Sequence, residues 1–281
     1  MKNLLAIVLV LFPAFTLFAQ ESEATTDLPV DAPFETSILI DNQTVVSPYK
    51  GGIEFEIHHR FGTVKNGITD IFGIYAPSNI RLGLNYGITD KLMFGAGTTK
   101  DYKLQDFQWK YAILQQTQSG KMPVSISYFG NFVVDARTKD VFGQEGQFKS
   151  MHRFSYFTQL IIARKFNDKF SFQVAPSCAY FNAVDEGYQN LNFGIHAGGR
   201  AKVIGYHSLI VEYDQLLTKQ DIPVQPKPNL SFGYEIGTGT HAFQIFVANY
   251  SGIIAQRNLL YNTNDLSKGE FLVGFNITAR F

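Results

Sequence analysis

The sequence has little cysteine, little charge and no long apolar run after its first residues, and each shortage excludes a class of protein. The single cysteine, Cys178, excludes a small secreted module held together by intrachain disulfides. Charged residues make up 17% of the chain, whereas an ordinary soluble domain carries about 25%. The net charge is zero, so the chain lacks the basic surface that nucleic-acid binding requires. No run beyond residue 19 approaches the ~18 apolar residues of a membrane-spanning helix.

Aromatic side chains are what the sequence has in excess. They form 15% of the chain, with 26 Phe and 14 Tyr. Abundant rings with few charges are typical of a surface that faces lipid and carries aromatic belts at the two membrane interfaces. The composition therefore favours a membrane protein built from strands over a soluble secreted protein.

Residues 1–19 have the pattern of a secretory signal peptide. A charged start at Lys2 precedes an apolar stretch from residue 4 to residue 18, and the small Ala19 lies before the predicted cleavage site. The next residue is Gln20 rather than a cysteine, which argues against a lipid-anchored lipoprotein. The chain is therefore expected to be exported and, given its composition, to reach the outer membrane of a Gram-negative bacterium.

The main signal in the rest of the chain is the alternation of apolar residues with polar or small ones. It is clearest from Glu270 to Phe281, where every second residue is apolar. Because successive side chains of a strand point to opposite faces, such a segment has one apolar face and one mostly polar face. Similar segments start near residues 53, 80, 92, 107, 124, 154, 170, 191, 208, 230 and 241, which gives about twelve strands of transmembrane length.

The connections between these segments alternate in length. Tight connections with Gly, Asn or Asp lie at 89–91, 119–121, 167–169, 205–206 and 237–239, and longer ones lie at 62–78, 99–105, 135–150, 182–190, 217–228 and 251–269. Outer-membrane barrels have short periplasmic turns and long outer loops. The pattern predicts an all-β fold: a transmembrane antiparallel up-and-down β-barrel of about twelve strands over residues 51–281, with both termini in the periplasm.

Three places fit this pattern less well. Residues 20–50 are expected to form a periplasmic N-terminal lead, in which residues 37–46 are a short hairpin, an extra strand or a plug in the lumen. Pro176 interrupts a strand-like run and predicts a bulge or an early end to pairing, because proline cannot donate to the ladder. Ile210 and Phe246 fall on the lumen face, which predicts local slips of register.

The C-terminal residue bears on assembly. Phe281 ends a clean alternating strand, and outer-membrane barrels commonly finish on an aromatic residue that the insertion machinery reads. The expected partners are therefore the lipid bilayer, the barrel-insertion machinery through the strand ending at Phe281, and small solutes, but not nucleic acid.

Three stretches resemble a known family. They are His58 to Gly62, Asn79 to Asp90 and Lys110 to Gln115. The chain, from about Leu28 to its end, is similar to the membrane-bound β-barrel domain of unknown function found mainly in Bacteroidetes. The resemblance implies the fold and the location of a membrane barrel. The family has no established activity, so the resemblance implies no catalytic or binding residue.

The inward face of the predicted barrel carries many charged residues and two histidines. They are Glu54, Glu56, His58, Arg60, Arg81, Lys110, Arg153, His196, Arg200, Lys202, Glu212, Asp214, Glu235, Glu270 and Arg280. Six are acidic and seven are Lys or Arg, and none suits the lipid face, where a mid-depth Arg or Lys costs ~2–4 kcal/mol. Two interpretations stay open. Ion pairs across the lumen hold a narrow barrel shut, or the lumen passes small solutes with little charge selectivity.

The predicted function is that of an outer-membrane barrel, either a narrow pore or a structural barrel of unknown solute. The alternatives are a non-transporting scaffold or docking subunit of an envelope complex, and a lipid-modifying enzyme. A membrane phospholipase of this architecture needs a His two residues before a Ser, but His207 and Ser208 are adjacent, and His152 and Ser155 are three apart. The protein is therefore predicted not to be an enzyme, and no catalytic, cofactor or metal site is predicted.

Overall fold

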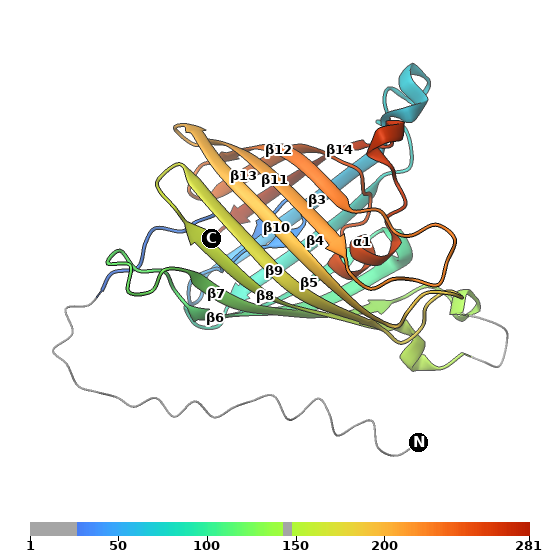
Figure 1. Ribbon diagram of the computed structural model, residues 1–281, viewed down its shortest axis with the longest axis horizontal. Coiled ribbons are helices and arrows are strands. Elements are labelled where there is room, and N and C mark those ends of the chain that lie inside the picture. Colours follow the sequence, from blue (N-terminus) through green and yellow to red (C-terminus); the bar gives the residue numbers. More distant parts are fainter. Residues whose placement is uncertain (1–26, 143–147) are drawn as a thin grey trace, which may run out of the picture.

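The chain forms a closed β-barrel that holds one segment of its own chain inside (Figure 1). The computed structural model describes residues 27–142 and 148–281. The predicted signal peptide, residues 1–19, and the start of the N-terminal lead lie outside the described residues. No helix within the described ranges is long and apolar enough to cross a membrane.

Twelve antiparallel strands make the barrel, each paired with its neighbours in the sequence. They are β3 (Ile53–Thr63), β4 (Asn79–Gly87), β5 (Leu92–Thr99), β6 (Leu104–Leu114), β7 (Ser125–Asp135), β8 (Phe154–Lys165), β9 (Phe170–Phe181), β10 (Leu191–Ile204), β11 (His207–Leu216), β12 (Asn229–Gly237), β13 (His241–Ala248) and β14 (Leu272–Arg280). The last strand pairs with the first, with Ile277 opposite Ile57, so the sheet closes without an edge. The predicted all-β up-and-down barrel of about twelve strands is confirmed.

The remaining elements are short. Inside the barrel lies a hairpin of β1 (Ile38–Leu39) and β2 (Asn42–Gln43). The loops contain the 3-10 helices η1 (Val64–Asp70), η2 (Asp101–Lys103), η3 (Lys139–Phe142), η4 (Ser150–Arg153) and η5 (Leu266–Lys268), and the α-helix α1 (Ala255–Tyr261).

The wall separates two environments, as the alternation predicts. On β4, the side chains of Arg81 and Asn85 are buried inside the barrel, whereas Leu82 and Leu84 point outward and are about half exposed. The pleat of a strand sends successive side chains to opposite faces, so the outside of the barrel is an apolar band and the inside is polar.

Short and long connections lie at opposite ends of the barrel, which are called here the turn end and the loop end. The C-terminus lies at the turn end (Figure 1). The β6–β7 connection, residues 115–124, is longer than the predicted turn at 119–121. The reason is that residues 28–30 pair with it: the Val30 N–H donates to the Gln116 carbonyl at 3.0 Å.

The irregular positions have physical causes that differ from those predicted. Ile210 and Phe246 do face the lumen, but the pairing of β11, β12 and β13 runs through both without a slip. They are buried there because the hairpin inside the barrel packs on them. Strand β9 continues through Pro176 in one register, and only the pairing with β8 is interrupted beside it. The predicted slips and the predicted bulge are therefore wrong, whereas the interrupted pairing with β8 beside Pro176 agrees with the predicted loss of a ladder hydrogen bond at a proline.

Two segments close the lumen. Residues 34–46, called the plug, carry the hairpin and run through the barrel from the turn end (Figure 1). Residues 250–264, called the cap, carry α1 and cover the lumen from the loop end. Leu39 and Ile40 of the plug and Leu259 and Leu260 of the cap are each at most 1% exposed. Both segments are therefore packed into the barrel as parts of its interior.

Candidate functional site

The candidate functional site is the lumen with its two closures, and the structure places the predicted lumen residues in three groups. Those buried inside are Glu54, Glu56, His58, Arg60, Arg81, Lys110, His196, Glu212, Asp214 and Glu235. Arg200 and Arg280 are half-buried at the turn end, and Arg153 is half-buried at the loop end. Lys202 is exposed near the β10–β11 turn, and Glu270 precedes β14 and pairs with Lys65 at 2.8 Å. These last two lie outside the lumen because Lys202 is at the turn-end rim of β10, two residues before that strand ends, and Glu270 is in the loop before β14.

Sequence reasoning missed three buried carboxylates, Asp106 on β6, Asp135 at the end of β7 and Asp41 of the plug. The guanidinium of Arg81 donates to both oxygens of Asp106, at 3.0 and 2.6 Å, and also to Glu56 at 2.7 Å. Alternation with Gln108 and Lys110 is the signal that would have placed Asp106 on the inward face.

The centre of the lumen is therefore rich in acid rather than balanced. Its buried carboxyl groups belong to Asp41, Glu54, Glu56, Asp106, Glu212 and Asp214, and its buried cationic side chains are Arg60, Arg81 and Lys110. Six acidic groups thus face three basic ones. The Glu235 carboxylate is paired separately with Arg200, at 2.6 Å.

The wall holds the plug largely through the plug's backbone. The backbone N–H groups of Asp41 and Asn42 donate to the two oxygens of the Glu212 carboxylate, each at 2.8 Å. Lys110 Nζ donates to the carbonyls of Ser37 at 3.1 Å and Val46 at 2.6 Å, and so binds both arms of the hairpin.

Neutral amides add to this backbone recognition. The Asn276 side chain donates to the Ile40 carbonyl at 2.6 Å, and the Gln244 side-chain oxygen accepts the Ile40 N–H at 3.2 Å. Gln173 donates to the Gln43 carbonyl at 2.9 Å. Buried backbone groups need such partners, so the wall satisfies a hairpin too short to satisfy itself.

Ion pairs and apolar contacts complete the hold on the plug. Arg60, which is fully buried, donates to Asp41 at 2.7 Å and lies over the Phe246 ring at 4.4 Å. At the turn end, Glu35 accepts from Arg200 at 3.3 Å and from Arg280 at 3.4 Å. Phe34, Leu39 and Ile40 pack in one cluster with Ile210, Phe246, Tyr250 and Leu272.

The cap is held by neutral groups. The side chain of Gln256 donates to Asn131 at 2.9 Å and to Ser155 at 3.3 Å. Leu260 packs with Phe129 and Phe157 of the wall. A cavity of about 30 Å³ remains between the plug and the cap, which is room for about two water molecules. The lumen is therefore filled in this structure.

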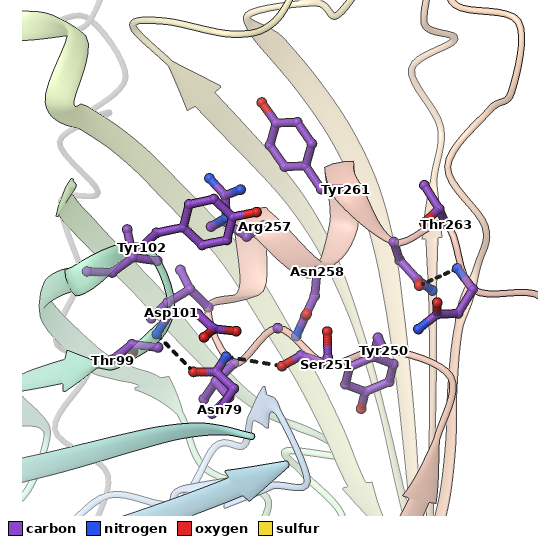
Figure 2. A pocket seen from close by; sticks show the side chains of 16 residues that line it. Asn79, Thr99, Asp101, Tyr102, Tyr250, Ser251, Arg257, Asn258, Tyr261 and Thr263 are labelled. Atoms are coloured by element: carbon purple, nitrogen blue, oxygen red, sulfur yellow. Dashed lines mark hydrogen bonds between the residues drawn. The ribbon is translucent and has the colours of Figure 1, made fainter. Parts of the chain in front are cut away.

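A larger pocket of about 180 Å³ opens at the loop end, between the cap and the β4–β5 side of the wall (Figure 2). The Arg257 guanidinium lies over the ring of Tyr102 at 3.7 Å and over that of Tyr261 at 4.7 Å. Burial raises the pKa of the Asp101 carboxyl, against the effect of the nearby Lys100 and Arg257. Burial also raises the pKa of Tyr261 to about 12, so this phenol is neutral at physiological pH.

Three adjacent strands bring together a serine, a histidine and an aspartate. Ser177 Oγ on β9 lies 2.8 Å from His196 Nε2 on β10, and His196 Nδ1 lies 2.8 Å from Asp214 Oδ1 on β11. The order of contacts is that of a serine hydrolase triad. The sequence analysis looked for a His and a Ser on one strand. It therefore missed this group, whose three residues come from three strands.

The surroundings of this group are those of a packed interior. Asp214 Oδ1 also accepts from the Asn42 side chain of the plug at 2.6 Å. A Cβ added at Gly194 would lie 2.7 Å from Leu259 Cδ2 and 3.0 Å from Ser177 Oγ, so the cap lies close over the serine. Among the described residues, no group of three or more His, Cys, Asp and Glu could hold a metal ion.

The sequence matches one family over most of its length. The family described as "Membrane bound beta barrel domain (DUF5777)" matches residues 34–281, a range that includes the plug as well as all twelve strands. No curated protein matches the sequence.

Solved structures share the fold at low identity. An outer membrane channel from Pseudomonas putida F1 is 11% identical with a TM-score of 0.50, and the match covers 84% of this chain and 97% of that one. The KdgM porin is 7% identical with a TM-score of 0.47, over 82% and 98% of the two chains. Outer membrane phospholipase A from Escherichia coli is 11% identical with a TM-score of 0.42, over 85% and 93%. At these identities the likeness concerns the fold alone.

Proposed function

Because this chain belongs to the membrane bound β-barrel domain family and its own plug fills its lumen, we propose that it is a gated outer-membrane channel for small polar solutes. The observation that carries the proposal is the closure of the barrel. Strand β14 pairs directly with β3, and the plug contributes no strand to the ring. Departure of the plug would leave the sheet intact and would uncover a wall that is mainly polar, with an apolar patch at Ile210, Phe246 and Leu272.

The charges of that surface favour cations. Once residues 34–46 leave, Glu54, Glu56, Asp106, Glu212, Asp214 and Glu235 remain on the wall, together with Arg60, Arg81, Lys110, Arg200 and Arg280, which loses its partner Glu35. Six acidic groups then face five basic ones in a narrow space, where fixed charge raises the local concentration of counter-ions. The expected solutes are therefore small and either neutral or cationic. A lumen with balanced charges would instead predict a pore without charge selectivity.

The proposal includes an orientation. The turn end, with the N-terminal lead and Phe281, faces the periplasm, and the loop end faces outward, because outer-membrane barrels have short periplasmic turns and long outer loops. The plug then enters from the periplasm, and insertion proceeds through the strand that ends at Phe281. Protease treatment of intact cells should cleave the loops and spare an epitope tag placed in the N-terminal lead after residue 20. Cleavage of that tag would show that the barrel has the opposite orientation.

Planar-bilayer recording tests the channel. The mature protein should be closed for most of the time, whereas a variant that lacks residues 20–46 should conduct whenever the cap opens, with a reversal potential that shows cation preference. Circular dichroism and heat-dependent gel mobility establish that the variant is folded. A folded variant that lacks residues 20–46 and does not conduct would contradict the proposal.

A non-transporting scaffold is the second candidate, and the apolar packing of the plug favours it. Phe34, Leu39 and Ile40 are buried as in an ordinary core, and such burial stabilises a permanent closure. Recording on the intact mature protein separates the two functions, because a scaffold barrel keeps its plug in place and shows no openings, whereas a gated channel opens from time to time.

The triad favours a third candidate, a hydrolase, but its burial supports a structural role and a protein that is not an enzyme. Ser177 is 7% exposed and does not line the cavity between plug and cap, and Asp214 is shared with the plug. A fluorophosphonate probe should therefore leave the mature protein unlabelled, and the variant that lacks residues 20–46 as well. The Ser177→Ala variant is the control. Labelling that disappears in this variant would establish the hydrolase instead.

A further inference from the structure

The loop-end pocket carries polar groups that the folded chain itself does not use. Thr99 and Asn258 both line this pocket, their side chains are at most 4% exposed, and neither Thr99 Oγ1 nor Asn258 Nδ2 has a hydrogen-bond partner among the described residues. A buried polar group without a partner is unfavourable. A ligand that supplies one acceptor and one donor here would therefore bind favourably.

The charged and aromatic groups of the pocket restrict what this ligand can be. Figure 2 shows Asp101 and Arg257 on the same side of the pocket, with Tyr102 beside Arg257. The guanidinium carbon of Arg257 lies over the rings of Tyr102 and Tyr261. No described residue accepts a hydrogen bond from that guanidinium, so its N–H edge is available to a ligand.

Each simple class of ligand conflicts with part of the lining. A metal cation would meet Arg257, a small inorganic anion would meet Asp101, and an apolar molecule would leave Thr99 and Asn258 without partners. A polyhydroxylated molecule conflicts with none of them, because each hydroxyl both donates and accepts. The other lining side chains are mainly of the same kind, with amides or hydroxyls at Asn79, Tyr250, Ser251, Asn262, Thr263 and Asn264.

We propose that the loop-end pocket is a saccharide-binding site. Its volume of about 180 Å³ is below the ~300–1,000 Å³ of a pocket for a drug-sized ligand, and suits one sugar ring. Asp101, Arg257, Thr99 and Asn258 supply hydrogen bonds to the ring hydroxyls, and the Tyr102 and Tyr261 rings supply apolar surface for its C–H groups.

A second cavity extends the site. It has a volume of about 360 Å³ and shares Tyr102, Leu104, Arg257 and Tyr261 with the pocket, so a disaccharide has room to occupy both. The second cavity is also lined by Arg137, Arg153, Asp135 and Asp185. Arg137 is paired with Asp135 at 2.6 Å, whereas Arg153 and Arg257 have no carboxylate partner among the described residues. Sugars with a carboxylate should therefore bind more tightly than neutral ones, because Arg forms charge-assisted hydrogen bonds with carboxylates.

Calorimetric titration of the full mature protein in detergent tests the site. Cellobiose represents neutral sugars, digalacturonate represents acidic ones, and inorganic phosphate represents a simple anion. We expect a Kd of about 1 mM for cellobiose, tighter binding of digalacturonate, and no binding of phosphate. Failure of both sugars to bind, or equal binding of phosphate, would overturn the proposal. The readout is binding, so it is independent of whether the barrel conducts.

Two variants locate the binding in this pocket. Thr99→Val removes a hydroxyl that has no partner in the folded chain, so it should weaken sugar binding about tenfold and leave the unfolding midpoint unchanged. Arg257→Gln should remove the preference for digalacturonate. Arg164→Gln is the matched control, since Arg164 also lies over a ring, that of Phe166, but at the turn end. Unchanged sugar affinity in Thr99→Val would overturn the proposal.

Discussion

The plug and the cap close the same lumen from opposite ends, but different chemistry holds each of them. The plug is bound by charged wall side chains, above all Glu212, Arg60 and Lys110. The cap is bound inside the barrel by neutral groups, Gln256 and Leu260, and its Arg257 lies over the aromatic ring of Tyr102 and not on a charged partner among the described residues. A buried charge that loses its partner costs more than a buried amide that loses its partner. The cap is therefore the weaker closure, and we expect it to open before the plug leaves.

The largest expected effect comes from breaking the ion pair inside the plug contact. Arg60→Met leaves the Asp41 carboxylate buried without its cation, which costs about 3–5 kcal/mol. The plug should then detach far more often. Maleimide labelling of a thiol introduced by Thr44→Cys, in a Cys178→Ala background, measures this, because Thr44 is fully buried while the plug is in place.

The matching control removes both charges. In the double variant Arg60→Met and Asp41→Asn, no charge of the pair stays buried alone, so labelling should return most of the way to the parental rate. If Arg60→Met alone leaves the labelling rate unchanged, charge does not hold the plug, and the contrast with the cap disappears.

A pair of glutamine variants sharpens the comparison with a smaller effect. Gln256→Leu leaves Asn131 and Ser155 without their cap partner, and Gln244→Leu leaves the Ile40 N–H of the plug without its acceptor. Each should cost about 1–3 kcal/mol. Hydrogen exchange should rise in residues 250–264 for the first and in residues 34–46 for the second. A rise in both segments from either variant would show that the two closures open together.

The barrel could be predicted from the sequence, because its strands meet two different solvents. A period of two is imposed wherever one face of a strand meets lipid and the other meets polar groups, and β4 shows it at every position from Arg81 to Tyr86. Loop lengths then gave the order and the number of strands. The twelve strands found are those predicted, apart from shifts of a few residues at their ends.

The plug could not be decided from the sequence, because its partners lie far away along the chain. Asn42 binds Glu212, 170 residues away, and Ile40 binds Asn276, 236 residues away. A hairpin of four paired residues has no period of its own to reveal its surroundings. The same distance explains Ile210 and Phe246, whose apolar side chains face inward because plug residues meet them there.

The charge balance of the lumen was mispredicted for a local reason. Alternation assigns a face to a residue but does not say where the strand ends. Lys202 and Glu270 satisfy the alternating pattern, yet one lies beside a turn and the other in a loop. Asp106 comes early in its strand and was left out, although it lies deep in the lumen on Arg81. The acid excess at the centre of the lumen follows from these three corrections, from Asp41 of the plug, and from the positions of Arg153, Arg200 and Arg280 at the ends of the barrel, where Arg200 pairs with Glu235.

The smallest expected effect tests whether carboxylates in the lumen and carboxylates in the loops differ in holding the plug. Glu270 and Glu212 are both glutamates on the predicted inward face, but Glu270 is an exposed partner of Lys65, whose hydrogen bond lowers the pKa of this carboxyl. The pair is therefore formed at neutral pH and is lost as the pH falls below the ordinary range of a carboxyl.

Because exposed pairs contribute little, Glu270→Gln should leave the thiol labelling at position 44 unchanged at pH 7. Glu212→Gln should raise it, since the new amide presents a donor to the backbone N–H groups of Asp41 and Asn42. Equal labelling in the two variants would mean that lumen and loop carboxylates do not differ in holding the plug.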